Sequence, residues 1–348
     1  MMGDDWIGPA VAAARHGDEA AFGRLVERFR PELTLHCYRM LGSLDDAEDT
    51  VQDVFLQAWR GLAGFKGRAS ARTWLYRITT HACLARRARD RRRHRLLSAN
   101  ATGGAVLPVV MTVPWLQACP DDLINRAAAR DPDPASTLVA RETIELAVIA
   151  ALQHLSGRQR AVFLLKDVVG WPAHQCATEL GLTLPAVNSA LQRARGGLRH
   201  HLGGSRDQWS AHPATTPAEQ ALVRRYIAAI ETADDAAIAA LLHDTVVVTH
   251  QPGAGGNQAA HPLCYTGRTT VIDAWAPALH SPRPVHLRLL EARANRQPGV
   301  ASYARLPGTA EHRAFGLSLL RVHHNQITEI TNLTPDQLAA FGLPPGFS

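Results

Sequence analysis

The chain has 348 residues, which is enough for two or three domains with apolar cores. Its formal charge of +6 is distributed unevenly. Residues 66–95 hold eleven Lys or Arg against the single acid Asp90, whereas residues 211–348 carry ten charges of each sign. We therefore expect the N-terminal part to bind an anion, and the C-terminal part to lack an electrostatic reason to bind nucleic acid.

The cysteines and the hydropathy pattern exclude several classes of protein. The five cysteines are far apart in the chain and lack zinc-binding spacing, which predicts reduced thiols, no metal site and no disulfide framework. No signal peptide and no apolar run near 18 residues is present. We expect a cytoplasmic protein that does not contact a membrane and needs no cofactor.

Helical periodicity begins at about residue 8 and continues to about residue 95, with Pro31 as the one internal interruption. In Asp45–Leu62, apolar residues form one stripe, and the opposite side is acidic but contains Leu56. A solvated charged face is the simpler interpretation. A leucine within a strip of carboxylates is also what a basic protein partner would bind.

A basic segment follows from Phe65 to Arg95, as a loop with Gly and Arg that leads into a helix. Arginines contact phosphates, and neighbouring aromatic side chains can stack on single-stranded or flipped bases. Trp74 is alternatively a core residue. Beyond this segment, residues 98–134 are rich in small residues and proline, which predicts an extended connector.

Helices are expected again from about Ala135 to Leu202, and they end in a pattern typical of a helix-turn-helix. The pattern predicts a short helix over Trp171–Leu180, a turn at Gly181 and a second helix over Thr183–Leu202. This second helix has a buried stripe at Leu184, Val187, Leu191, Ala194 and Leu198. Its other face bears amides, a hydroxyl and guanidinium groups without a carboxylate, a set that suits base edges and phosphates. An ordinary surface helix with two arginines is the alternative.

After a second linker the predicted secondary structure changes from helical to mixed. Two helices over about 217–242 are followed by several β-rich runs. This order suggests helices packed against a curved antiparallel sheet. The expected strands are Thr245–Thr249, Val285–Arg293, Val300–Arg305, Phe315–Val322 and Gln326–Asn332. An enzyme site in this block would draw on His250, Tyr265, Asp273, His286 or Tyr303, but the sequence does not show that any two of them converge. A small-molecule sensor is the other alternative.

Three segments in this order resemble a bacterial sigma factor of the extracytoplasmic-function group. Asp45–Trp59 is similar to the region 2 helix that binds the β′ clamp helices of RNA polymerase. Phe65–Arg93 resembles the part that melts and reads the −10 element, and Leu155–Arg195 resembles region 4, which reads the −35 element. Val113–Ile124 and pieces of the last block are similar to sigma factors with a fused SnoaL-like domain.

The resemblance implies roles for particular residues. Binding of core polymerase, through the β′ clamp helices with a contribution from the β subunit, would use Asp45, Asp49, Gln52, Asp53 and Leu56. The −10 DNA would meet Lys66, Arg68, Arg72, Thr73, Arg77, Thr80 and His81. The −35 DNA would meet Pro185, Asn188, Ser189, Gln192, Arg193 and Arg199. No catalytic or metal-binding residue is implied.

The expected architecture is multidomain, with two all-α sigma domains and a C-terminal α+β cone-shaped domain of the SnoaL or NTF2 type. The expected boundaries are region 2 at 8–96, an extended linker at 97–134, region 4 at 135–203, a second linker at 204–216 and the SnoaL-like domain at 217–348. The expected function is promoter selection for RNA polymerase, without catalysis by this chain.

Two further expectations concern regulation and rival functions. The third domain would modulate activity through its sheet face and its tail, residues 332–344, which would contact region 2 or the connector near Trp115. The alternatives are a one-component helix-turn-helix regulator with a small-molecule-sensing SnoaL-like domain, and an enzyme with DNA-binding appendages. The one-component regulator does not explain the acidic strip with Leu56, and the enzyme would need a base and an oxyanion partner that face one cavity.

Overall fold

The structure is a computed structural model that describes residues 4–67, 69–90, 108–129, 143–202, 216–280, 285–306 and 308–347. The chain forms two compact units. Unit 1 consists of Met1–Thr102 and Asp122–Ser210, and unit 2 of Gly103–Asp121 and Ala211–Ser348. The two segments expected to be separate sigma domains therefore share one unit, and part of the expected connector belongs to unit 2.

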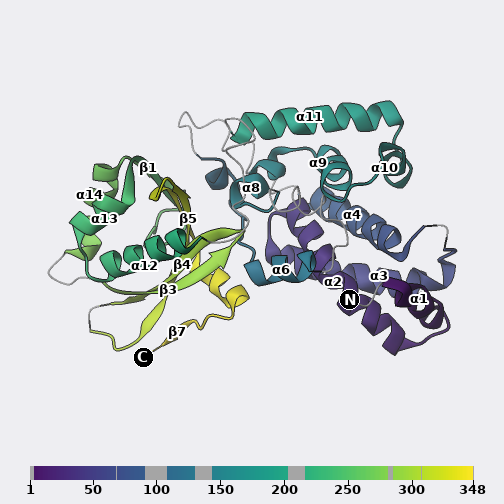
Figure 1. Cartoon of the computed structure of the whole chain (residues 1–348), viewed down its shortest axis with the longest axis horizontal. Coiled ribbons are helices and arrows are strands. Elements are labelled where there is room, and N and C mark those ends of the chain that lie inside the picture. Colours follow the sequence, from purple (N-terminus) through teal and green to yellow (C-terminus); the bar gives the residue numbers. More distant parts are fainter. Residues whose placement is uncertain are drawn as a thin grey trace. The chain divides into compact units, whose positions relative to one another are not determined.

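Unit 1 begins with helices that pack around an apolar core (purple to blue in Figure 1). Helix α2 continues through the buried Pro31, so the interruption expected there is wrong. Gly42 ends α2 in the left-handed conformation, and the side chain of Ser43 caps α3. The helices are α1 (Ile7–Arg15), α2 (Glu19–Leu41), α3 (Leu44–Gly61) and α4 (Ala71–Arg89).

The second half of unit 1 contains the helix-turn-helix. Gly181 has φ +62° and forms the turn that the sequence predicts. The helices are α6 (Asp121–Ala128), α8 (Leu146–His154), α9 (Gly157–Phe163), α10 (Ala173–Leu180) and α11 (Leu184–Leu202), with a π-helical turn, η4, over Leu164–Val168. The buried stripe of α11 is confirmed apart from Leu184, which is 47% exposed because it lies in the first helical turn.

The two halves of unit 1 meet through α2, α4, α8 and α9, around a fully buried arginine. Arg160 of α9 donates hydrogen bonds to the carbonyl oxygen of Met40 on α2 and to the side-chain oxygen of Gln153 on α8. Gln153 in turn donates to the Arg39 carbonyl oxygen at 3.4 Å. The interface therefore has a polar centre, which satisfies carbonyl groups near the end of α2.

Unit 2 is built on a curved seven-stranded sheet of order β2-β1-β6-β5-β4-β3, with β7 paired to β5 (green to yellow in Figure 1). All pairs are antiparallel except β1 with β6, so the fold class is confirmed, while the sheet is mixed rather than purely antiparallel. The strands are β1 (Leu242–His250), β2 (Leu263–Thr266), β3 (His286–Ala294), β4 (Gln297–Arg305), β5 (His312–His323), β6 (Gln326–Leu333) and β7 (Gly346–Phe347).

Three helices cover one face of this sheet and enclose the core of unit 2. Alternate strand residues such as Val248, Val300 and Leu320 point toward these helices and are buried with Leu222 and Tyr226. The helices are α12 (Pro217–Glu231), α13 (Asp235–Leu241) and α14 (Arg268–Leu279). A short 3-10 helix, η6 (Pro335–Phe341), follows the last long strand.

The part of the connector that belongs to unit 2 is bound to this domain by hydrogen bonds. The backbone N–H of Ala118 donates to the side chain of Gln337 on η6 at 2.8 Å, and the N–H of Cys119 donates to the side chain of Asn295 at 2.8 Å. Gln251 donates to the Leu116 carbonyl oxygen at 3.1 Å. Buried connector backbone is thereby satisfied by polar side chains of the domain.

The expectation that the whole connector is extended is wrong for two segments. Residues Val109–Thr112 form a 3-10 turn, η3, and Asp121–Ala128 form helix α6. In α6 the apolar residues Leu123, Ile124 and Ala127 are spaced three and four apart and are buried, so helical periodicity is present despite the flanking prolines. None of the described helices is long and apolar enough to cross a membrane.

Candidate functional site

The acidic face of α3 lies on the outside of unit 1. Val51, Val54 and Ala58 on the opposite side are fully buried. Leu56 is 55% exposed, which makes it one of the most exposed large apolar side chains among the described residues. Every residue predicted to contact core polymerase is exposed, namely Asp45, Asp49, Gln52, Asp53 and Leu56.

The acidic face also has an internal partner. Arg86 of α4 pairs with Asp46 at 2.5 Å and with Asp49 at 3.4 Å. These carboxylates, together with their hydrogen bonds, raise the pKa of Arg86, although burial acts in the opposite direction. Asp49 is therefore already paired within unit 1. Asp53 and Leu56 take no part in this ion pair, so substituting either of them would leave it intact.

Helix α4 bears most of the residues predicted to meet −10 DNA, and several of them have protein partners. Arg72 donates to Glu32 of α2 at 2.9 Å, and its guanidinium lies over the ring of Tyr76. Lys66 is exposed in the loop before α4. Arg68 lies outside the described residues. The pairing of Glu32 with Arg72 could not be predicted from local pattern, because the two residues lie forty positions apart.

Thr80 does not belong to a DNA-binding surface, so its assignment to the −10 site is corrected. Its side chain is fully buried, donates to the Tyr76 carbonyl oxygen at 2.8 Å and lies 2.9 Å from Nε2 of His36. Burial and the nearby charges of Arg39 and Arg72 lower the pKa of His36 to about 3, so this imidazole is neutral at pH 7. Helical periodicity places Thr80 on the buried side with Tyr76, which is also a core residue.

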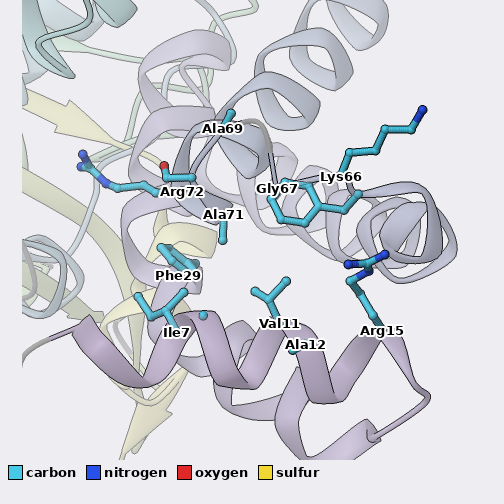
Figure 2. Close-up of a pocket in the computed structure, with 13 residues that line it drawn as sticks. Ile7, Val11, Ala12, Arg15, Phe29, Lys66, Gly67, Ala69, Ala71 and Arg72 are labelled. Atoms are coloured by element: carbon cyan, nitrogen blue, oxygen red, sulfur yellow. The ribbon is translucent and has the colours of Figure 1, made fainter.

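A pocket of about 600 Å³ lies between α1 and the loop before α4 (Figure 2). Ile7 and Val11 point into it from α1, and Phe29 closes its floor. Lys66 and Arg72 come from the opposite wall, and their charged ends extend outward on two sides, so an apolar interior is combined with cationic groups outside its rim. Such a pocket suits a planar apolar group that is attached to phosphates. Trp74 is half-buried beside Phe65, with ring centroids 5.0 Å apart, close to this loop.

The recognition face of α11 is open. Five of the residues predicted to read −35 DNA are exposed and Ser189 is half-buried; the five are Pro185, Asn188, Gln192, Arg193 and Arg199. Arg195, which was not assigned to DNA, donates two hydrogen bonds to Asp167 at 2.9 and 2.8 Å. This pairing raises the pKa of Arg195 and ties α11 to η4.

Helix α10 of the helix-turn-helix contacts the side of α4 that the sequence predicts to face DNA. Glu179 pairs with Arg77 at 3.6 Å, and its backbone carbonyl lies 2.9 Å from Nε2 of His81. Gln175 donates to the hydroxyl of Thr73 at 3.4 Å. Three residues predicted for −10 DNA thus meet protein atoms, and the sequence contained no signal for these contacts between segments about one hundred residues apart.

Of the candidates for an enzyme site in unit 2, His250 and Tyr265 are the pair with a contact among the described residues. His250 and Tyr265 lie together, with ring centroids 5.9 Å apart, and burial lowers the pKa of His250. Asp273 is exposed on α14, as expected, and His286 is exposed on β3. Tyr303 is buried and donates to the Pro344 carbonyl oxygen at 3.0 Å. Among the described residues, no group of three or more potential ligands could hold a metal ion.

Comparisons with known proteins match this arrangement. Family models match as Sigma-70 region 2 over residues 25–93, Sigma-70 region 4 over residues 145–196 and a SnoaL-like domain over residues 223–330. The chain is 38% identical to the ECF RNA polymerase sigma factor SigG of Mycobacterium tuberculosis, over 97% of this chain and 87% of that protein.

Two further comparisons agree with the first. The ECF RNA polymerase sigma factor SigW of Bacillus subtilis is 25% identical, over 55% of this chain and 94% of that protein. The crystal structure of the extracytoplasmic function sigma factor SigJ of Mycobacterium tuberculosis aligns with a TM-score of 0.55 at 23% identity, covering 91% of this chain and 98% of that chain, which shows a shared fold. Together with the match along nearly the whole chain, these findings show that the protein belongs to the extracytoplasmic-function family of RNA polymerase sigma factors and has a SnoaL-like domain fused on the C-terminal side of region 4.

Proposed function

We propose that this sigma factor directs RNA polymerase to promoters through three surfaces of unit 1. The exposed face of α3 binds the core enzyme, the loop before α4 together with α4 binds the opened −10 strand, and α11 reads the −35 element in the major groove. The chain performs no catalysis. It supplies promoter choice and strand opening, while the core enzyme supplies the chemistry.

The observation that supports this proposal most strongly is the 55% exposure of Leu56 within the acidic face of α3. Placing an apolar side chain in water is unfavourable, and carboxylates around it select a partner with basic and apolar groups. A one-component regulator that binds only DNA has no use for such a face. Binding of core polymerase therefore separates the sigma-factor function from this alternative.

The test uses Leu56→Asp with Leu306→Asp as the matched control, because these two leucines are 55% and 57% exposed. Leu56→Asp should weaken binding of purified core polymerase by about tenfold or more, since a buried leucine contributes roughly 1.5–3 kcal/mol. Leu306→Asp should leave binding unchanged. Affinity is measured by pull-down and by fluorescence titration. Equal affinities of both variants and the parent protein would remove the α3 face from the proposal.

The −10 surface is supported by the pocket in Figure 2 and by the cations around it. An apolar pocket bordered by Lys66 and Arg72 has the composition required for a flipped base with flanking phosphates. Arg77 and His81 extend the same surface along α4. Of the residues expected to act here, Thr80 is left out because it is buried.

We further propose that the SnoaL-like domain modulates transcription through the connector. This role is supported by hydrogen bonds that the side chains of Gln337 and Asn295 accept from the N–H groups of Ala118 and Cys119, and by the bond that Gln251 donates to the Leu116 carbonyl oxygen. Because the connector leads directly into α6, the domain can restrict how regions 2 and 4 are tethered. Small-molecule sensing by the domain has no comparable support from the contacts of His250 and Tyr265.

Gln337→Ala tests the connector role, because it leaves the buried N–H of Ala118 without its acceptor, at a cost of about 1–3 kcal/mol. Amide exchange in residues 109–119 should become at least about fivefold faster, and transcription should change in the same direction as after removal of the domain. Gln326→Ala, at the β5–β6 turn, is the control. Unchanged exchange in the connector together with unchanged transcription would contradict the proposed modulation.

A further inference from the structure

A row of basic and aromatic side chains crosses one end of the sheet in unit 2. His286 of β3 pairs directly with Arg305 of β4, and His312 of β5 pairs directly with Phe347 of β7. The pairing of β4 with β5 reaches Ala304, so the next residue, Arg305, lies beside His312. Residues that lie directly opposite one another share a face of the sheet. We call these four side chains the β3–β7 row.

The β3–β7 row lies on the face of the sheet that is opposite to the three helices. Leu289 of β3 and Val300 of β4 are buried with the helices, and side chains alternate between the two faces along a strand. Arg288, which precedes Leu289, therefore lies with the row on the other face. His250 lies two positions beyond the buried Val248 and belongs to the helix-covered face. The row is thus separate from the surroundings of His250.

Positive charge accumulates in the β3–β7 row. Nε of Arg305 and Nδ1 of His312 are buried, and neither atom has a hydrogen-bond partner among the described residues. Burial lowers the pKa of His312, and the nearby charges of Arg305 and Arg288 lower it further. The carboxylate of Glu231 acts in the opposite direction, but it already pairs with Arg288 at 3.5 Å. The row therefore combines cationic groups with unsatisfied nitrogen atoms.

This combination suits a small anion. A guanidinium binds a phosphate through parallel N–H donors, and an imidazolium adds another donor. Holding a charged group such as that of Arg305 partly out of water without an acceptor is costly, and a bound anion offsets this cost. A long nucleic-acid strand is not favoured as the ligand, because residues 211–348 carry ten charges of each sign.

The β7 end of the row is aromatic. The ring centroid of Phe347 lies 4.8 Å from that of Tyr303 and 5.4 Å from that of His312. Neighbouring strands are about 4.8 Å apart, so the row extends over about 14 Å from β3 to β7. This length accommodates a phosphate at the β3 end and a planar ring at the β7 end, which are the two parts of a nucleotide.

We propose that the β3–β7 row is a binding site for a small phosphorylated ligand, whose phosphate lies against His286 and Arg305 and whose planar part contacts Phe347. Arg288 supplies a second guanidinium from the edge strand. Its side chain is 62% exposed, so its pair with Glu231 is weak in water and can be exchanged for a pair with the phosphate. Because β7 carries Phe347, the ligand also holds this short strand on the sheet. The site does not depend on the function proposed for unit 1.

The experiment titrates the full-length protein with inorganic phosphate and with AMP in a calorimeter, at an ionic strength held constant with sodium chloride. Arg305→Gln should weaken the binding of both probes by about tenfold or more, because it removes the guanidinium that holds the phosphate. The matched control is Arg313→Gln. Arg313 pairs with Ala304, one position before Arg305, so it points to the other face, and it pairs with Glu311 at 3.2 Å. This control should change both affinities less than twofold.

The two probes separate a nucleotide from a free anion. AMP should bind more tightly than inorganic phosphate, and Phe347→Leu should remove this difference without weakening the binding of phosphate. Equal affinities of the parent protein for AMP and phosphate would overturn the contact of Phe347 with a planar group and leave an inorganic anion as the ligand.

Two further measurements keep the proposal testable if Arg305→Gln does not fold, which urea unfolding would reveal. Arg288→Gln, at an exposed position, should weaken phosphate binding about threefold. Phosphate should also slow amide exchange of Ala314, whose N–H donates to the Pro345 carbonyl oxygen at 2.9 Å next to β7. No binding by the parent protein at about 10 mM phosphate would overturn the site. Equal losses of affinity in Arg305→Gln and Arg313→Gln would do the same, because they would indicate an unspecific effect of charge.

Discussion

Helices α4 and α11 share three sequence features. Each is nineteen residues long, basic and free of acidic residues. In the folded chain they differ in what surrounds their cations. On α4, Arg72, Arg77 and Arg86 pair with carboxylates of other helices. On α11, Arg193 and Arg199 are exposed on the recognition face, and Arg195 alone is tied to a carboxylate in the part of the chain that the structure describes.

This difference shows that composition predicts the chemistry of a helix but not whether that chemistry is accessible. The predicted recognition face of α11 is exposed in this structure. On the predicted DNA-binding face of α4, Arg77 already pairs with Glu179, so a phosphate would have to compete with this carboxylate. We therefore expect substitutions on the exposed face of α11 to reduce DNA recognition directly, whereas substitutions of paired residues on α4 also change the stability of unit 1.

The largest expected effect is on α11. Gln192→Ala with Arg193→Ala removes two exposed side chains from the recognition face, and each lost base contact costs on the order of 1–3 kcal/mol. Discrimination among −35 sequences should fall about tenfold or more per contact, as measured with holoenzyme on promoters selected from a random library by the parent protein.

The control for this prediction is Arg195→Ala. Arg195 lies on the same helix but is held by Asp167, so its loss should lower the stability of region 4 without changing the preferred −35 sequence. If the Gln192, Arg193 variant selects the same sequences as the parent with the same preference, α11 does not read bases through these residues and the comparison with α4 fails.

Several features of the fold and the site follow from the sequence because they depend on local pattern. The period of apolar residues predicts α3 and the buried side of α11, and Gly181 predicts the turn of the helix-turn-helix. The exposure of Asp53 and Leu56 follows from the same periodicity. These features need only the geometry of one helix or one turn.

Other features could not be predicted, because they depend on which distant segments meet. The contact of Thr80 with His36 of α2 and the pairing of Arg77 with Glu179 of α10 each join segments that are far apart in the chain. The parallel pairing of β1 with β6 is likewise decided by tertiary packing and not by strand propensity. Helix α6 was missed for a different reason, since its one short apolar stripe is surrounded by prolines and small residues.

The smallest effect we predict compares two glycines that end helices in the left-handed conformation. Gly42 has φ +76° and Gly181 has φ +62°, so alanine at either position should cost roughly 1 kcal/mol from backbone strain. They differ in their surroundings. A Cβ at Gly42 would lie 2.8 Å from the side chain of Gln153, whereas at Gly181 nothing lies within 4 Å.

Gln153 is a buried residue that donates to the Arg39 carbonyl and accepts from Arg160, so displacing it disturbs the interface between the two halves of unit 1. Gly42→Ala should therefore lower the free energy of unfolding by about 2 kcal/mol, against about 1 kcal/mol for Gly181→Ala. Urea unfolding measures both free energies. Equal losses of stability in the two variants would mean that the packing of Gln153 against Gly42 adds nothing to the stability of unit 1.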